Sequence, residues 1–191
     1  MMLWKKLFNV LLTGNTEVTS KGSIDVKGTF KLGGTAVDAT ADELNRSNDA
    51  SSRIVTSTAT ALSLTVTQHG ERVLLVNTNS TVANTFTLPA ATGSGVKFTV
   101  INNIAQTQGS VVVAANGTDV IKGLAVVAGS TVADAQAFLT SATSDKVTFN
   151  RTTTGGLGQD SVECWDSAAN TWNVRVIANG SGTLATPFSA T

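Results

Sequence analysis

Short apolar runs separated by turn-forming residues follow one another from Ile54 onward, and this spacing constrains the fold more than any other feature. In ALSLTVTQ, alternation places Leu62, Leu64 and Val66 on one face, as in a strand that is buried on one side. The runs RVLLVNT, NTFTLPA, VKFTVINN and SVVVAA follow, with turn formers such as Gln108-Gly109 between them. No long helical period interrupts the series, so the sequence predicts a mainly β protein, an antiparallel β-sandwich or jelly-roll-like domain.

Two further patterns predict pairs of strands. Asn116-Gly117 is a strong tight-turn signal, and we expect residues 111–115 and 119–121 to pair across it. Near the end, DSVECWDSAANTWNVRVIANG predicts a hairpin with its turn at residues 166–170. Its inward-facing residues are expected to be Val162, Cys164, Trp172, Val174 and Val176. The Ala-rich residues 131–140 lie before a Thr/Ser run, and we expect a strand or a loop there.

The first 50 residues differ from the rest and predict an arm attached to the domain. Residues 13–34 are rich in Gly and polar residues, with brief alternation in SIDVKGTFKL, which is typical of an extended segment with one or two short strands. Thr40 and Glu43 have capping-box spacing, in which each side chain accepts a hydrogen bond from the other residue's amide. We therefore expect a helix at about residues 41–48, an N-terminal arm of residues 1–50 and a β-sandwich domain of residues 51–191.

Residues 3–12 predict a short amphipathic helix within this arm. Its apolar residues at helical spacing are Leu3, Trp4, Leu7, Phe8, Val10 and Leu11, with Lys5, Lys6 and Asn9 opposite. A helix of this length is marginal in water, so it needs a partner surface: its own domain, a neighbouring chain or shell, or a membrane surface. The lysines and Asn9 interrupt the apolar run and no Ala-x-Ala site follows, so we expect neither a secretion signal nor a membrane span.

The charge composition argues against an electrostatic partner. Lys plus Arg and Asp plus Glu number 13 each, the net charge is zero, and charged residues make up 14% of the chain, against about 25% in typical soluble domains. We therefore expect no binding to nucleic acid or to an anionic membrane. A chain with little charge repulsion and 41% hydrophobic residues is typical of a component of an assembly.

No set of residues predicts catalysis. His69, the only histidine, precedes Gly70 and is expected in a surface turn. Among the acidic residues, Asp160 and Asp166 are expected on one face of a strand and Glu163 on the other, as solvated turn ends and not a paired-carboxylate site. The glycine-rich residues 155–158 lack the Lys-Ser/Thr of a phosphate-binding loop.

The lone cysteine, Cys164, excludes an intramolecular disulfide and a cysteine-based zinc site, and we expect it to be a small buried apolar residue. Together with the absence of a catalytic pattern, this leads us to expect no enzymatic activity, no cofactor and no metal.

Four segments carry a resemblance to a known class of protein. They are GGTAVDATADELN within residues 30–45, LPAATGSGVKFTVINN at residues 88–103, NGTDVIKG at residues 116–123 and the last hairpin, DSVECWD with NTWNV. In this order they resemble virion surface proteins of tailed phages, in which a short arm motif precedes a β-rich domain. The most similar kinds are capsid decoration, or cement, proteins and short head or tail fibres.

The resemblance implies a structural protein of the outer capsid surface that stabilises contacts between capsid subunits. Its expected partners are the major capsid protein and further copies of itself in a homotrimer. The expected capsid-contact residues of the arm are Trp4, Leu7, Phe8 and Leu11, because buried aromatic and aliphatic side chains dominate most protein contacts. The alternative is a head or tail fibre or collar protein whose β-domain binds a receptor, a glycan or a protein, on the host surface.

Overall fold

The protein is mainly β, with two sheets packed face to face, in a computed structural model that describes residues 31–48, 53–130 and 134–190. The chain divides into two units, residues 1–41 and 42–191. In the first, β1 (Lys31–Leu32) and β2 (Thr35–Ala36) pair antiparallel. Gly33 and Gly34, with φ of 57° and 87°, make the two-residue turn, which demands positive φ at both positions. Helix α1 (Ala41–Asn48) occupies the range indicated by the capping-box pattern.

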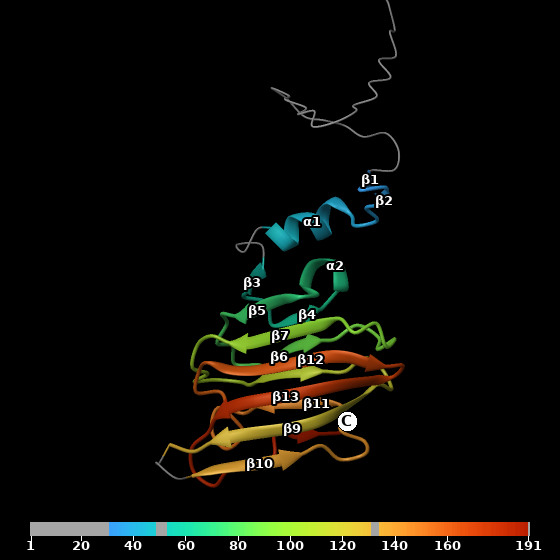
Figure 1. Ribbon diagram of the computed structural model, residues 1–191. Helices are drawn as coiled ribbons and strands as arrows, with labels where there is room; N and C mark the ends of the chain where they lie inside the picture. The colour runs from blue at the N-terminus through green and yellow to red at the C-terminus, as the bar shows by residue number, and fades with distance from the viewer. Residues whose placement is uncertain (1–30, 49–52, 131–133, 191) are drawn as a thin grey trace, which may run out of the picture. The chain divides into compact units, whose positions relative to one another are not determined.

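The larger sheet has seven strands, and the smaller one has five (Figure 1). In spatial order the larger sheet contains β10 (Ala135–Leu139), β9 (Val120–Ala128), β13 (Thr171–Asn179), β12 (Asp160–Ala168), β7 (Lys97–Asn102), β5 (Arg72–Val76) and β3 (Ile54–Ser57). The smaller sheet contains β14 (Phe188–Ser189), β11 (Lys146–Phe149), β8 (Val111–Ala114), β6 (Asn84–Thr87) and β4 (Ala61–Ser63). One hydrophobic core lies between them, to which Phe98 and Trp172 of the larger sheet and Phe86 and Phe149 of the smaller sheet contribute.

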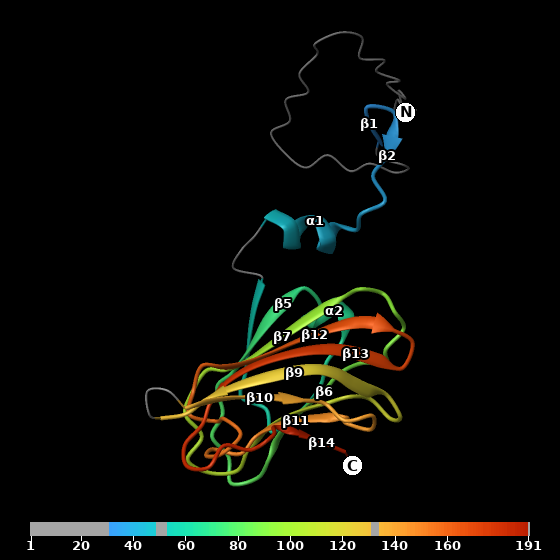
Figure 2. The same ribbon diagram turned by 60° about the horizontal axis from the view of Figure 1, so that its bottom comes forward.

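The sheets are mixed, so the expectation of an antiparallel sandwich is wrong in its strand directions. The pairs β3–β5, β5–β7, β9–β13, β4–β6 and β6–β8 are parallel. From β3 to β8 the chain alternates between the sheets, and each strand lies parallel to the strand two places before it. Jelly rolls consist of antiparallel strands, so this pairing does not support that part of the expectation. Figure 2 shows the two layers from another side.

Two predicted local structures are wrong. The ALSLTVTQ strand ends at Ser63, because Thr65 caps helix α2 (Val66–His69) by accepting a hydrogen bond from the Gln68 amide at 3.3 Å. Residues 111–115 and 119–121 do not form a hairpin, since β8 and β9 belong to different sheets. A tight turn does lie between them, with the Asp119 amide donating to the Asn116 carbonyl at 2.9 Å.

The C-terminal hairpin is confirmed. β12 and β13 pair antiparallel in the middle of the larger sheet, and all five residues expected to face inward are at most 1% exposed. The ring of Trp172 contacts that of Phe98 edge to face, with 5.6 Å between centroids. Residues 135–139 form strand β10, in keeping with the expected strand or loop. The period-2 pattern therefore identifies the inward face of this sheet correctly.

Candidate interaction surface

The outward-facing side of the seven-stranded sheet, termed the outer face below, carries most of the exposed apolar side chains. Nine large hydrophobic residues are exposed in the part of the chain that the structure describes, and five of them lie here. They are Ile54, Leu124, Val126, Leu139 and Ile177, with Leu139 the most exposed at 79%. Scattered apolar residues are normal on protein surfaces, but a gathered group of them is typical of an interaction site.

Strand register arranges the outer face in two rows across six strands. The first row runs Val73, Thr99, Glu163, Arg175, Leu124 and Leu139 from β5 to β10. The second row, two residues further along each strand in space, runs Leu75, Ile101, Ser161, Ile177, Val126 and Ala137. Glu163 and Arg175 are the only charged residues in these rows, and they lie directly opposite each other on the neighbouring strands β12 and β13.

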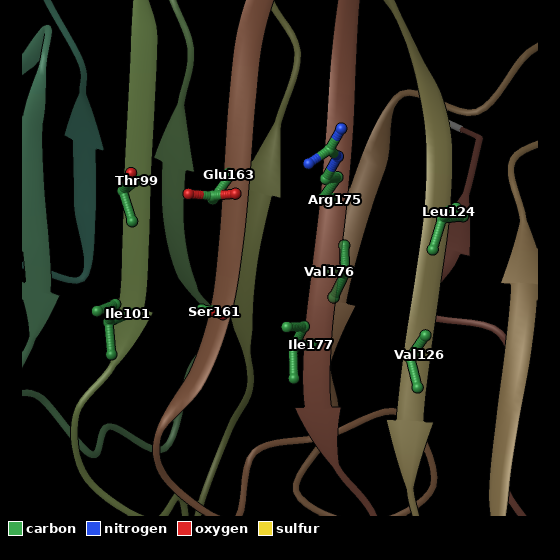
Figure 3. Close-up of a pocket in the computed structure, with 9 residues that line it drawn as sticks. All are labelled: Thr99, Ile101, Leu124, Val126, Ser161, Glu163, Arg175, Val176 and Ile177. Carbon is green, nitrogen blue, oxygen red and sulfur yellow. The ribbon is translucent and has the colours of Figure 1, made fainter.

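A shallow groove of about 510 Å³ follows the middle of these rows (Figure 3). Its walls come from β7, β12, β13 and β9: Thr99, Ile101, Ser161, Glu163, Arg175, Val176, Ile177, Leu124 and Val126. Figure 3 shows Glu163 and Arg175 on adjacent strands, with Leu124 and Val126 on β9 and Ile101 on β7 to either side. The arrangement is a flat apolar surface with one acid and one base at its centre, and it suits contact with another protein surface.

The charged groups at the upper end of this groove are tied to one another. The Lys97 ammonium lies 3.4 Å from Glu163 Oε1. The Trp165 ring has Lys97 Nζ 5.8 Å and the Arg175 guanidinium 5.2 Å from its centroid, within cation–π range. Among the described residues, no carboxylate lies within 4 Å of Arg175, which is exposed. This guanidinium therefore has an aromatic neighbour and is free to bind an external acid.

The carboxylate of Asp166 is internal and holds a loop. It accepts hydrogen bonds from the Thr92, Gly93 and Ser94 amides at 2.9, 2.7 and 3.0 Å, and from the Thr92 and Ser94 hydroxyls at 2.9 and 2.7 Å. Burial by itself raises the pKa of Asp166, but these hydrogen bonds, led by those from Ser94, outweigh it and lower the pKa to about 2. Asp166 thus stabilises the connection before β7.

Asp160, at the other end of β12, has a similar role. Its carboxylate accepts from the Gly156, Gly158 and Asn179 amides at 3.0, 3.2 and 2.7 Å, and from the Asn102 side-chain amide at 3.1 Å. The glycine-rich residues 155–158 therefore direct their amides at a carboxylate of the protein itself. Asp160 and Asp166 do share a face opposite to Glu163, as predicted, but they are 0% and 2% exposed, so the expectation of solvated turn ends is wrong.

His69 is also buried, and its expected place in a surface turn is wrong. It ends α2, is 6% exposed, and its Nδ1 accepts a hydrogen bond from the Thr65 amide at 3.0 Å. Burial is the main cause that lowers the pKa of His69, although the hydrogen bond to Thr65 acts in the opposite direction. The ring is therefore neutral at pH 7 and completes the cap of a one-turn helix. Cys164 is fully buried, as predicted, and burial strongly raises the pKa of its thiol.

The sequence-predicted contact residues Trp4, Leu7, Phe8 and Leu11 lie outside the described residues. The outer face was not predicted, although β5, β9 and β13 have apolar residues at both inward and outward positions, as in VLLV and LAVV. In the described ranges, no three His, Cys, Asp or Glu side chains are grouped as metal ligands would be. The same ranges contain no helix with the length and apolar character to cross a membrane.

No protein-family model, no curated protein and no solved structure matches this chain.

Proposed function

We propose that the chain is a structural virion protein that decorates the outer surface of a phage head and stabilises contacts between capsid subunits. The observation that carries the proposal is the outer face, where five exposed large hydrophobic residues gather on a domain of an uncharged chain. Such a surface is covered in proteins that work in assemblies. The resemblance of four segments to tailed-phage surface proteins selects the virion as the assembly.

Two of the resembling segments form one structural unit, which supports treating them together. LPAATGSGVKFTVINN contains β7 and the loop before it, and DSVECWD lies in β12. β12 pairs with β7, and Asp166 of β12 holds the loop at Thr92, Gly93 and Ser94. Residues more than 70 positions apart in the sequence thus depend on one another, and the similarity covers a single three-dimensional element.

The proposed mechanism is bridging. The arm, with Trp4, Leu7, Phe8 and Leu11 as anchors, binds the major capsid protein across the joints between subunits, while the β-domain remains outside. Each apolar anchor contributes about 25 cal/mol per Å² of buried apolar area, and repetition around a shell multiplies a modest contact. The joints then open only when these contacts also break. The proposal includes no enzymatic step, cofactor or metal.

Co-sedimentation with phage heads that lack the protein tests this function. We expect binding to saturate near one group of copies per capsid trimer, and a variant lacking residues 1–12 to lose attachment while its β-domain stays folded. The matched control is the pair Lys5→Ala and Lys6→Ala, which alters the opposite side of the same predicted helix and should still bind. A few copies per head would instead indicate a fibre or collar protein, and full attachment of the truncated chain would refute the anchors.

A further inference from the structure

The outer face of the seven-stranded sheet has an arrangement of charges that is complementary to itself. Glu163 on β12 and Arg175 on β13 lie directly opposite each other, and these two strands are next to each other near the centre of the sheet. Apolar or hydroxyl-bearing residues surround them in both rows. A surface with one acid and one base side by side can meet a copy of itself so that each charge faces its opposite.

We propose that the outer face binds the outer face of a second copy of this chain, related by a two-fold axis that runs along the strands between β12 and β13. This rotation places β12 of one copy over β13 of the other. Glu163 of each copy then faces Arg175 of its partner, at the same level along the strands. Sheets pack about 10 Å apart, a gap that these two long side chains can bridge.

The same rotation matches the remaining strands. It brings β9 over β7 and β10 over β5. In the second row, Val126 then meets Ile101, and Ala137 meets Leu75. In the first row, Leu139 meets Val73. The contact is thus apolar on both flanks of a central pair of ion pairs, and no residue in these two rows faces a like charge.

The end of the sheet beyond these rows is the polar rim of the proposed contact. It carries Lys97, Trp165, Asn173 and Lys122. The rotation would bring Lys97 near the partner's Lys122, but both ammonium groups already have partners in their own copy. Lys97 pairs with Glu163, and the Lys122 ammonium donates to the Ser141 and Ala142 carbonyls at 3.1 and 2.6 Å. Solvent at a rim screens the repulsion that remains.

The area agrees with a real but modest contact. Six strands at about 4.8 Å spacing and three rows of residues about 7 Å apart cover about 600 Å² per copy. The total of about 1,200 Å² is at the lower limit of stable interfaces. We therefore expect a dimer that dissociates on dilution. This inference does not depend on the virion role, because the purified chain alone tests it.

Reciprocal charge reversal gives the sharpest experiment, with the mass measured by analytical ultracentrifugation over a range of concentrations. Wild-type protein should shift from one to two copies as concentration rises. Glu163→Arg alone and Arg175→Glu alone should each raise the dissociation constant at least about tenfold, since each places like charges over one another twice. A mixture of the two single variants should form heterodimers, because both facing pairs then have opposite charges again. The double variant should also dimerise.

Controls distinguish this contact from association through another surface and from loss of folding. Lys146→Glu, a charge reversal on a strand of the five-stranded sheet, should dimerise like the wild type, and unfolding curves should show that all variants fold. A chain lacking residues 1–12 should also dimerise. A wild-type mass of one or of three copies at every concentration, a dimer that is indifferent to the reversals, variants that fail to associate when mixed, or loss of the dimer with the arm would each overturn the proposal.

Discussion

Replacement of Asp166 by Asn isolates the energy with which one carboxylate holds the loop before β7. The amide has the same shape, and its oxygen can keep the hydrogen bonds from the Thr92 and Gly93 amides. Its NH₂ group cannot accept the bond that the Ser94 amide donates to Oδ2 at 3.0 Å. A donor left without a partner costs about 1–3 kcal/mol, so we expect the variant to lose about 2 kcal/mol of unfolding free energy at pH 7.

The dependence on pH follows from the lowered pKa of Asp166. A pKa of about 2 in the folded protein, against 3.8 in the unfolded chain, stabilises the fold only where the carboxylate is ionised in both states. The contribution is therefore full above about pH 5 and is lost as the pH falls through 3.8 towards 2. It amounts to at most about 2.5 kcal/mol at pH 7, about 1.3 at pH 3 and about 0.4 at pH 2. The donating loop is exposed, so solvent screening makes these upper values.

Urea unfolding of both proteins between pH 7 and pH 2.5 measures this effect. The stability difference between wild type and Asp166→Asn should shrink as the pH falls. Asp38→Asn, the same change at an exposed carboxylate, should alter stability little at any pH. A difference that stays constant down to pH 2.5 would refute the assigned ionisation, and no difference at pH 7 would refute the loop-holding role.

Two further substitutions test the core and the parallel pairing. Trp172→Ala should cost about 3–5 kcal/mol of unfolding free energy, and Trp172→Phe clearly less, because Trp172 is fully buried against Phe98 and its Nε1 has no hydrogen-bond partner among the described residues; equal stability of Trp172→Ala and wild type in thermal or urea unfolding would contradict the packing. Gly123→Ala should cost about 3 kcal/mol, since a Cβ there would lie 1.9 Å from the Val174 carbonyl oxygen, whereas Gly117→Ala, in open space at φ 56°, should cost about 1 kcal/mol; the opposite order in the same assay would show that β9 and β13 are not so close.

The sequence predicted which residues face the core better than it predicted which strands pair. In the last hairpin, alternation and the large Trp172 side chain identified the inward face, because burial acts on each residue locally. Strand direction leaves no such trace. A period of two is the same in parallel and antiparallel pairs, so the parallel pairing of β3, β5 and β7 was beyond a pattern-based prediction.

Buried polar groups were misjudged for a related reason. Asp160, Asp166 and His69 are polar types that usually lie at the surface, and only their partners explain their burial. Some of these partners are distant in sequence, such as Ser94 for Asp166. The cap of α2 by Thr65 was local and could have been recognised, because Thr at an N-cap is a known helix signal. The outer face was visible in principle as strands that are apolar on both sides.

The strand orders of the two sheets imply different histories during synthesis. The five-stranded sheet adds β4, β6, β8, β11 and β14 in chain order, each beside the last. In the seven-stranded sheet, β3, β5 and β7 emerge as one block and β9 and β10 as another, and no ladder joins the blocks until β12 and β13 enter between them. Until about residue 179 has left the ribosome, the blocks present open edges at β7 and β9, which are prone to pair with other chains. The late hairpin therefore closes the sheet, and nascent chains that stop short of it should be the ones that aggregate.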